Sequence, residues 1–185
     1  MRDGATPQMR IRTEEPGDQP AVYEVVRQAF GRDTESELVE GIRRSPGWIP
    51  ELSLVAERDG AIVGHILLSR FTIAGEAGTG DVPALVLAPL AVAPAMQNQG
   101  VGSALVRAGL ARAEAMGERL VVLVGHPTYY PRFGFRPARP LRVEQQTQSY
   151  SRRAAIDSLR HRGDAAGRPP CRAPAAGPTR RARTP

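Results

Sequence analysis

A polar, glycine-containing turn near the middle of the chain joins an apolar run to a helical pattern. Residues 90–93 are apolar, and Pro94 ends the run because proline has no N–H for a strand ladder. Apolar residues recur at helical spacing from Val101, and Gly117 stands where a helix commonly ends in a left-handed residue. The turn at 97–102 therefore leads from a buried strand into a helix. Free backbone N–H groups and the helix dipole make such a turn a favourable site for a phosphate.

Five backbone N–H groups are placed to face such an anion, those of Gln99, Gly100, Val101, Gly102 and Ser103. The two glycines let the backbone approach an anion without a Cβ in the way. Many ordinary helix starts also contain glycine, so the pair alone is weak evidence. The spacing matches neither the dinucleotide fingerprint nor the lysine-containing phosphate loop, which disfavours NAD and ATP.

Hydrophobic patterning predicts an α/β fold with a mixed sheet. Antiparallel pairs come first and a strand–helix–strand crossover second, so a doubly wound parallel sheet is not expected. Asp59-Gly60 marks a tight hairpin turn. The expected elements are a strand at 9–12, helices at 19–30 and 34–44, strands at 52–56, 61–73 and 83–93, a helix at 101–116, a strand at 120–124 buried on both faces, and a helical turn at 128–133.

The 185 residues favour one domain with a tail. We expect a disordered lead at 1–8, the folded domain at 9–144 and a basic, disordered tail at 145–185, with at most a helical turn at 154–159. Nothing after Val143 has strand character, which predicts that the sheet lacks a final strand and keeps an unpaired edge.

Charge is divided unevenly along the chain, which carries +6 in total. Residues 1–144 hold 16 arginines and 17 acidic residues, whereas residues 145–185 hold 9 arginines and 2 acidic residues. A folded nucleic-acid-binding domain usually carries a basic patch of its own. Nucleic acid is therefore not an expected partner of the domain, and binding through the tail is the weakest hypothesis.

Composition also limits which cellular location and which kind of metal or disulfide site can be expected. No run of about 18 apolar residues exists, so no membrane span is expected. The N-terminal residues lack the apolar segment of a signal peptide, which favours a cytoplasmic protein. Cys171 is the single cysteine, so neither an internal disulfide nor a cysteine-based metal site is expected, and no metal is assigned.

Two motifs resemble those of the GNAT superfamily of N-acetyltransferases. Gln97-x-x-Gly100-x-Gly102, between a strand and a helix, is similar to the family's acetyl-CoA signature. The segment Tyr-Pro-Arg-Phe-Gly-Phe at 130–135 is similar to its Tyr-x-x-x-Gly-Phe segment. The separation of the motifs also fits, and the resemblance covers about residues 9–143.

The segment at 125–135, Gly-His-Pro-Thr-Tyr-Tyr-Pro-Arg-Phe-Gly-Phe, resembles most closely that of one bacterial group within this superfamily. The resemblance implies acetyl-CoA as co-substrate and an amine of a small molecule, peptide or protein as acceptor. It places Gln97 in the cofactor site and the pyrophosphate on the amides of Gln99, Gly100, Val101, Gly102 and Ser103. The pantetheine arm would follow the strand edge at Leu90, Ala91 and Val92.

The same resemblance implies direct attack of the amine on the thioester, with Tyr130 as general acid for the leaving thiolate. An ordinary phenol has a pKa of about 10 and stays protonated at neutral pH, so it can donate a proton. The amide of Val92 is a candidate to polarise the carbonyl oxygen. The alternative role for Tyr130 is ring packing; for the neighbouring Tyr129, packing or lining the substrate pocket is expected.

A general base is not evident; Glu51, His65 and water are the alternatives. His126 follows a strand, where it is either structural or a substitute for an asparagine that many relatives carry before the tyrosine. Trp48 either lines the acceptor site or closes the core. The runner-up function is a catalytically impaired acyl-CoA-binding relative that lacks the final strand, and a homodimer is left open.

Overall fold

The computed structural model describes residues 9–73, 81–137, 142–144, 153–155 and 158–161. The lead expected at 1–8 lies outside these residues, as does most of the tail, and the domain boundaries stay predictions. The helices are α1 Gln19–Phe30, α2 Thr34–Arg43 and α3 Val101–Ala115, with a 3-10 helix η4 at Tyr130–Phe133. The strands are β1 Met9–Thr13, β2 Ser53–Arg58, β3 Ala61–Ile73, β4 Val82–Val92, β5 Leu120–Leu123, β6 Arg136–Pro137, β7 Arg142–Glu144, β8 Arg153–Ala155 and β9 Ser158–His161.

The main sheet is mixed and has the strand order β1-β2-β3-β4-β5-β9-β6, which confirms the expected fold class. Strands β1 to β4 pair antiparallel, and β4 pairs parallel with β5 across the α3 crossover. At the β2–β3 hairpin, Asp59 and Gly60 both have positive φ, as the Asp-Gly signal predicts.

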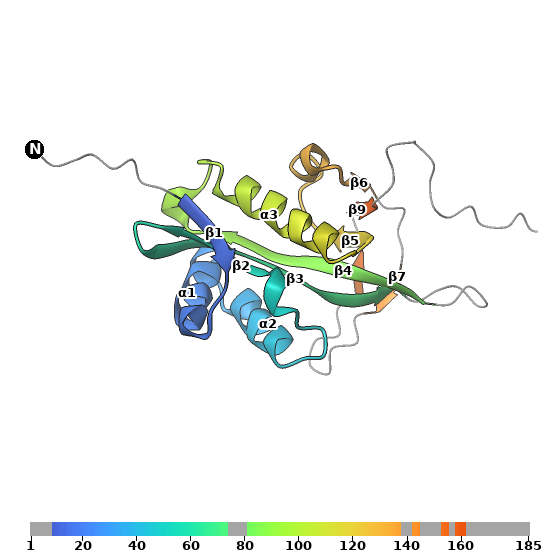
Figure 1. Ribbon diagram of the computed structural model, residues 1–185, viewed down its shortest axis with the longest axis horizontal. Helices are drawn as coiled ribbons and strands as arrows, with labels where there is room; N and C mark the ends of the chain where they lie inside the picture. The colour runs from blue at the N-terminus through green and yellow to red at the C-terminus, as the bar shows by residue number, and fades with distance from the viewer. Residues whose placement is uncertain (1–8, 74–80, 138–141, 145–152, 156–157, 162–185) are drawn as a thin grey trace, which may run out of the picture.

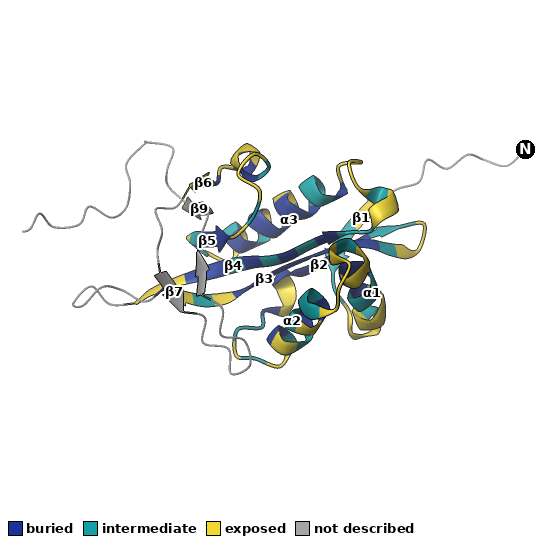
Figure 2. Cartoon of the chain, turned by 180° about the vertical axis from the view of Figure 1, so that it is seen from behind, coloured by how far each residue is buried: buried dark blue, intermediate teal, exposed yellow. Residues whose placement is uncertain are grey.

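Helices cover both faces of the sheet, with α3 on one face and α1 and α2 on the other (Figures 1 and 2). On the α3 face, Leu54, Ile66 and Leu68 pack against Leu105 of the helix. The opposite layer of apolar side chains holds Val22, Val26, Val39, Val55 and Leu67. Side chains alternate between faces along a strand, so β2 and β3 contribute to both layers. None of the helices in the described part is long and apolar enough to cross a membrane.

The prediction that nothing after Val143 forms a strand is wrong, and the stretch at 154–159, which allowed at most a helical turn, contributes residues to β8 and β9. β8 pairs with β7 in a small second sheet, and β9 pairs antiparallel with β5. β9 in turn pairs with β6, so the edge of β5 that was expected to be open is occupied. Backbone hydrogen bonding can form such a strand even where the sequence shows no alternating pattern.

The side chain at the N-cap of α1 pairs outside the helix. Asp18 stands at the N-cap, but its carboxylate makes no side-chain cap bond to α1. It pairs with the Arg12 guanidinium instead and accepts a hydrogen bond from the Glu15 N–H. Asp33 occupies the N-cap of α2, and it also makes no side-chain cap bond. Val124, expected in a strand buried on both faces, follows β5 and is 57% exposed.

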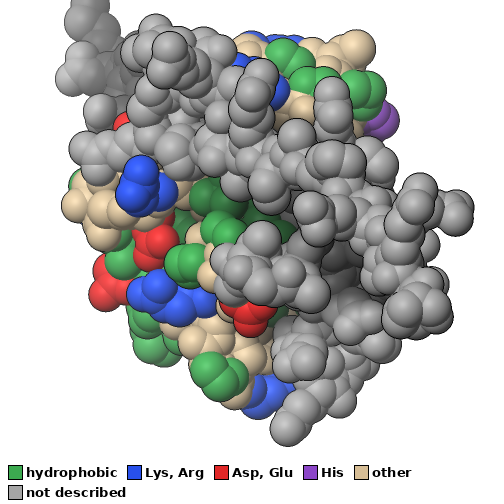
Figure 3. Space-filling model, turned by 90° about the vertical axis from the view of Figure 1, so that its right-hand side faces the viewer, with side chains coloured by type: hydrophobic (Ala, Val, Ile, Leu, Met, Phe, Trp, Pro, Cys, Tyr) green, Lys and Arg blue, Asp and Glu red, His purple; other side chains and the backbone are tan. Residues whose placement is uncertain are grey.

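Charged side chains are interspersed over the end of the molecule shown in Figure 3. Basic and acidic groups alternate there with apolar ones over the described residues, and grey atoms mark the others. The described residues on this face thus show mixed rather than segregated charge, in keeping with the balanced composition of residues 1–144.

Candidate active site

Strand β4 loses its β5 partner halfway along its length. The parallel register between them consists of Leu85 with Val121 and Val86 with Val122. On the other side β4 remains paired with β3 as far as Val92, with a one-residue bulge between Leu87 and Leu90. The second half of β4 therefore has an edge without a strand partner in the described part of the chain.

The direction of the backbone groups along this edge follows from one hydrogen bond. Ala93 N–H donates to Val63 O of β3 at 2.9 Å, so residue 93 faces β3. Because successive residues of a strand face opposite sides, the backbone groups of Leu90 and Val92 face the open edge. The Val92 carbonyl accepts a hydrogen bond from Gln97 Nε2 at 3.2 Å. The N–H of Val92 is directed into the gap between β4 and β5.

The loop after β4 is held by side chains at both ends. Gln97 anchors it to β4, while Gln99 Nε2 donates to the Ala95 carbonyl at 2.9 Å. Arg58, at the end of β2, donates to Gln99 Oε1 at 3.1 Å. Gly100 has φ +85°, a conformation that favours glycine, and the helix begins directly after it.

The first turn of α3 faces the open edge of β4. Its first intrahelical bond runs from Ala104 N–H to Gly100 O at 3.0 Å, so the N–H groups of residues 101–103 have no acceptor within the helix. A Cβ on Gly102 would lie 3.5 Å from Val92 Cγ2 and 3.8 Å from Leu90 Cδ2. The strand edge and the glycine turn predicted from the sequence are thus neighbours in space.

Other predicted cofactor residues are placed differently. Ala91 is buried on the α1 and α2 side of the sheet, away from α3. The side chain of Gln99 is engaged by Arg58, so its contribution to an anion would come from its backbone. The cofactor roles assigned to these residues stay predictions.

Tyr130 lies in η4, and its ring packs into the core beside β5. The ring lies edge-on to Phe135, with centroids 5.7 Å apart, and a Cβ on Gly125 would come within 2.3 Å of it. Burial, with a smaller contribution from the neighbouring Tyr129, raises the pKa of Tyr130 to about 12. The phenol therefore keeps its proton throughout the neutral and mildly alkaline range, as a general acid requires.

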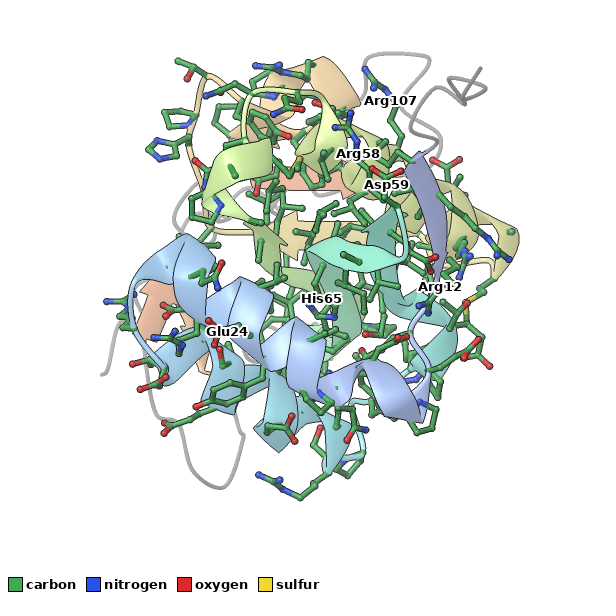
Figure 4. The ribbon with its side chains drawn as sticks, turned by 90° about the vertical axis from the view of Figure 1, so that its left-hand side faces the viewer. Arg12, Glu24, Arg58, Asp59, His65 and Arg107 are labelled. Carbon is green, nitrogen blue, oxygen red and sulfur yellow. The ribbon has the colours of Figure 1, made fainter. Side chains whose placement is uncertain are left out.

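Glu51 and His65, the side-chain candidates for a general base, differ in burial and in place, as do Trp48 and His126. Glu51 is exposed near the C-terminal end of α3, where its carbonyl accepts a hydrogen bond from Arg112 at 3.2 Å. His65 is fully buried on β3, between the sheet and helices α1 and α2 (Figure 4). Trp48 is half-buried and packs against the apolar layer of α1 and α2. His126 is exposed in the turn after β5, where its carbonyl accepts a hydrogen bond from Tyr129 N–H.

His65 belongs to a buried polar cluster that the sequence did not predict. Its Nε2 lies 3.0 Å from Ser53 Oγ and 3.5 Å from Glu14 Oε2. Glu14 accepts a hydrogen bond from Ser53 and pairs with Arg43, whose side chain is 7% exposed. These residues come from four separate segments, so no spacing in the sequence could have brought them together. The cluster joins β2 and β3 to α2 and to the segment after β1.

The ionisation of this cluster is set by burial and by Arg43. Burial lowers the pKa of His65 below its ordinary value of 6.5, although Glu14 acts in the opposite direction. For Glu14, burial alone would raise the pKa. Hydrogen bonds from His65 and Ser53, together with the charge of Arg43, bring it below its ordinary value of 4.5. At neutral pH a neutral histidine therefore lies beside a carboxylate–guanidinium pair.

Lowering the pH from 7 to 5 will reduce the free energy of unfolding, because unfolded His65 takes up a proton that the buried imidazole resists. Because the pKa of His65 is lower in the folded than in the unfolded protein, the free energy of unfolding is retained above pH 6.5 and lost progressively below it. Urea unfolding at several pH values measures this loss. His65→Gln should flatten the dependence. Identical midpoints for the wild type at pH 7 and 5 would contradict a neutral buried His65.

Comparison with known proteins agrees with this geometry. Residues 10–138 match the family model described as an acetyltransferase (GNAT) domain. The uncharacterized N-acetyltransferase YjhQ of Escherichia coli is 44% identical over 121 residues, which are 65% of this chain and 65% of YjhQ. The match thus spans just under two thirds of the relative's length. The uncharacterized N-acetyltransferase YhbS of Escherichia coli is 37% identical over 128 residues, 69% of this chain and 73% of YhbS.

Two solved structures are also similar to this chain. A GNAT family acetyltransferase from Brucella melitensis in complex with acetyl-CoA superposes with a TM-score of 0.64 and 30% identity, covering 84% of this chain and 97% of that one. Escherichia coli YhbS in complex with CoA gives a TM-score of 0.67 and 28% identity, covering 87% and 85%. The chain therefore belongs to the GNAT family of acetyltransferases.

Proposed function

We propose that the protein is an acetyl-CoA-dependent N-acetyltransferase that transfers the acetyl group to a primary amine by direct attack. The observation that carries this proposal is the open edge of β4 beside the first turn of α3. The edge of β4 offers backbone groups to an extended arm that contains amides. The first turn of α3 offers N–H groups to a diphosphate. The complexes with acetyl-CoA and CoA of related GNAT structures support the same co-substrate.

Different residues at this edge bind different parts of acetyl-CoA. The amides of Gln99, Gly100, Val101, Gly102 and Ser103 hold the diphosphate, and Gln97 positions their loop against Val92. Leu90 and Val92 provide the backbone edge for the pantetheine arm, and buried Ala91 supports that edge from the opposite face. Bound acetyl-CoA supplies the thioester that is consumed.

In the reaction the amine nitrogen forms a bond to the thioester carbonyl carbon, and the carbon–sulfur bond breaks. The Val92 N–H polarises the carbonyl oxygen, whose negative charge grows in the transition state. Tyr130 gives its proton to the departing thiolate and regains one from solvent. Water is the acceptor of the amine's proton, because Glu51 is exposed near the C-terminal end of α3 and the His65 imidazole is fully buried between the sheet and helices α1 and α2 (Figure 4).

Isothermal titration with acetyl-CoA tests the proposal first, on protein whose fold is verified by a cooperative thermal melt. We expect saturable binding, followed by release of free thiol when amines are added. An acceptor panel of amino acids, polyamines, amino sugars and peptide N-termini would identify the substrate class. Absence of any binding heat by the folded protein would contradict the proposal.

The alternative, a catalytically impaired acyl-CoA-binding protein, rested on a missing final strand. β9 beside β5 removes that reason. Binding of acetyl-CoA without thiol release over the whole amine panel would restore the alternative. The cytoplasmic location stays a prediction.

A further inference from the structure

The two adjacent tyrosines of η4 and its N-cap have different surroundings. The Tyr130 ring is buried in the core, whereas Tyr129 is half-buried and turned toward α3. The rings meet edge-on with centroids 5.0 Å apart. Chemically identical side chains in neighbouring positions thus have different surroundings.

The ring of Tyr129 is held on several sides. Phe133 lies 5.4 Å away between centroids, and the Arg132 guanidinium stacks 4.6 Å from the Tyr129 centroid. Arg132 Nε also donates to the Tyr129 carbonyl at 2.9 Å. These contacts fix the direction of the phenol and so the position of its hydroxyl.

That hydroxyl lies at the first turn of α3. Tyr129 Oη is 3.1 Å from the point that a Cβ on Gly102 would occupy, and 3.4 Å from Ser103 Oγ. The second distance exceeds the ~2.8 Å typical of a hydroxyl–hydroxyl hydrogen bond, so the donor is only weakly engaged. It lies beside N–H groups that also lack an acceptor within the helix.

We propose that the Tyr129 hydroxyl donates a hydrogen bond to the diphosphate of bound acetyl-CoA and is a cofactor-binding residue; this rests on the proposed function. An anion at the α3 N-terminus provides a stronger acceptor for this donor than Ser103 Oγ at 3.4 Å does. The phenol adds a side-chain donor to a cradle otherwise made of backbone amides. Because Gly102 has no side chain, the space between the Tyr129 hydroxyl and the first turn of α3 stays open. The two tyrosines then have separate tasks: Tyr129 in cofactor affinity and Tyr130 in proton transfer.

The experiment compares Tyr129→Phe with the wild type on two thioesters, acetyl-CoA and S-acetylpantetheine, which has no diphosphate. For acetyl-CoA we expect Kd and KM to rise on the order of tenfold, as for the loss of one hydrogen bond to a charged group, with kcat nearly unchanged. For S-acetylpantetheine we expect no change in kcat/KM. Equal losses on both thioesters, or no loss on either, would overturn the assignment.

The design also separates this inference from the proposed function. A wild type that fails to bind acetyl-CoA overturns both, whereas a wild type that binds and a variant that matches it overturn the Tyr129 assignment alone. The substitution removes one oxygen atom, so the thermal midpoint should be preserved. Turnover of S-acetylpantetheine by the variant verifies, in the same sample, that the rest of the site is intact.

Discussion

Tyr130→Phe will lower kcat by about 10²-fold while the KM for acetyl-CoA stays close to that of the wild type, because a general acid acts only on the transition state. The substitution keeps the ring that packs on Phe135 and removes only the proton donor. Steady-state rates from thiol release measure the effect. Tyr129→Phe is its matched partner, with the opposite expected division between KM and kcat.

The pH dependence of kcat adds a second test of Tyr130. A phenol with its ordinary pKa of 10 would begin to lose its acid form just above pH 9, whereas burial raises the pKa of Tyr130 to about 12. We therefore expect no alkaline loss of kcat up to pH 10 in the wild type. Unchanged kcat in Tyr130→Phe would remove the residue from the mechanism, and a fall in kcat centred on pH 9 to 10 would show that its acid form is not protected by burial.

Gly102→Val will weaken acetyl-CoA binding by about 10²-fold or more, since it disrupts several charge-assisted hydrogen bonds together. The added Cβ would lie 3.1 Å from Tyr129 Oη, in the space between the α3 first turn and the end of β4. Gly102 has ordinary helical φ, so the substitution fills space without forcing a left-handed backbone. Calorimetry with CoA measures the loss.

Gly41→Val is the control for this variant. Gly41 also lies within a helix, but a Cβ there would meet nothing within 4 Å, and α2 lies on the opposite face of the sheet. We expect CoA affinity equal to that of the wild type. Retention of wild-type affinity by Gly102→Val would show that the diphosphate does not occupy this turn.

Local signals in the sequence predicted the turns, the hairpin and the type of sheet well. Gly60, Gly100 and Gly117 all adopt the left-handed conformation at turns that the sequence predicts. A glycine with positive φ is a property of a few residues, so it is visible without knowledge of the partner strands. The hairpin, the crossover helix and the mixed sheet followed from such signals together with apolar periodicity.

Features that depend on contacts between distant segments were not predictable in this way. The sequence marks 90–92 as a strand, but only the parting of β5 after Val122 shows which of these residues border the gap. The cluster of Glu14, Ser53 and His65 shares no motif. The placement of Tyr129 against Gly102 requires the packing of η4 on α3, whereas the motif drew attention to Tyr130.

The pairing of β9 with β5 has a consequence for the order in which the chain folds. During synthesis β1 to β5 and α3 emerge before β9, so the outer edge of β5 stays open until residues 158–161 leave the ribosome. The acetyl-CoA half of the site can therefore assemble on a nascent sheet that still carries a free, aggregation-prone edge. A shortened chain that stops at residue 144 would remain permanently at that stage.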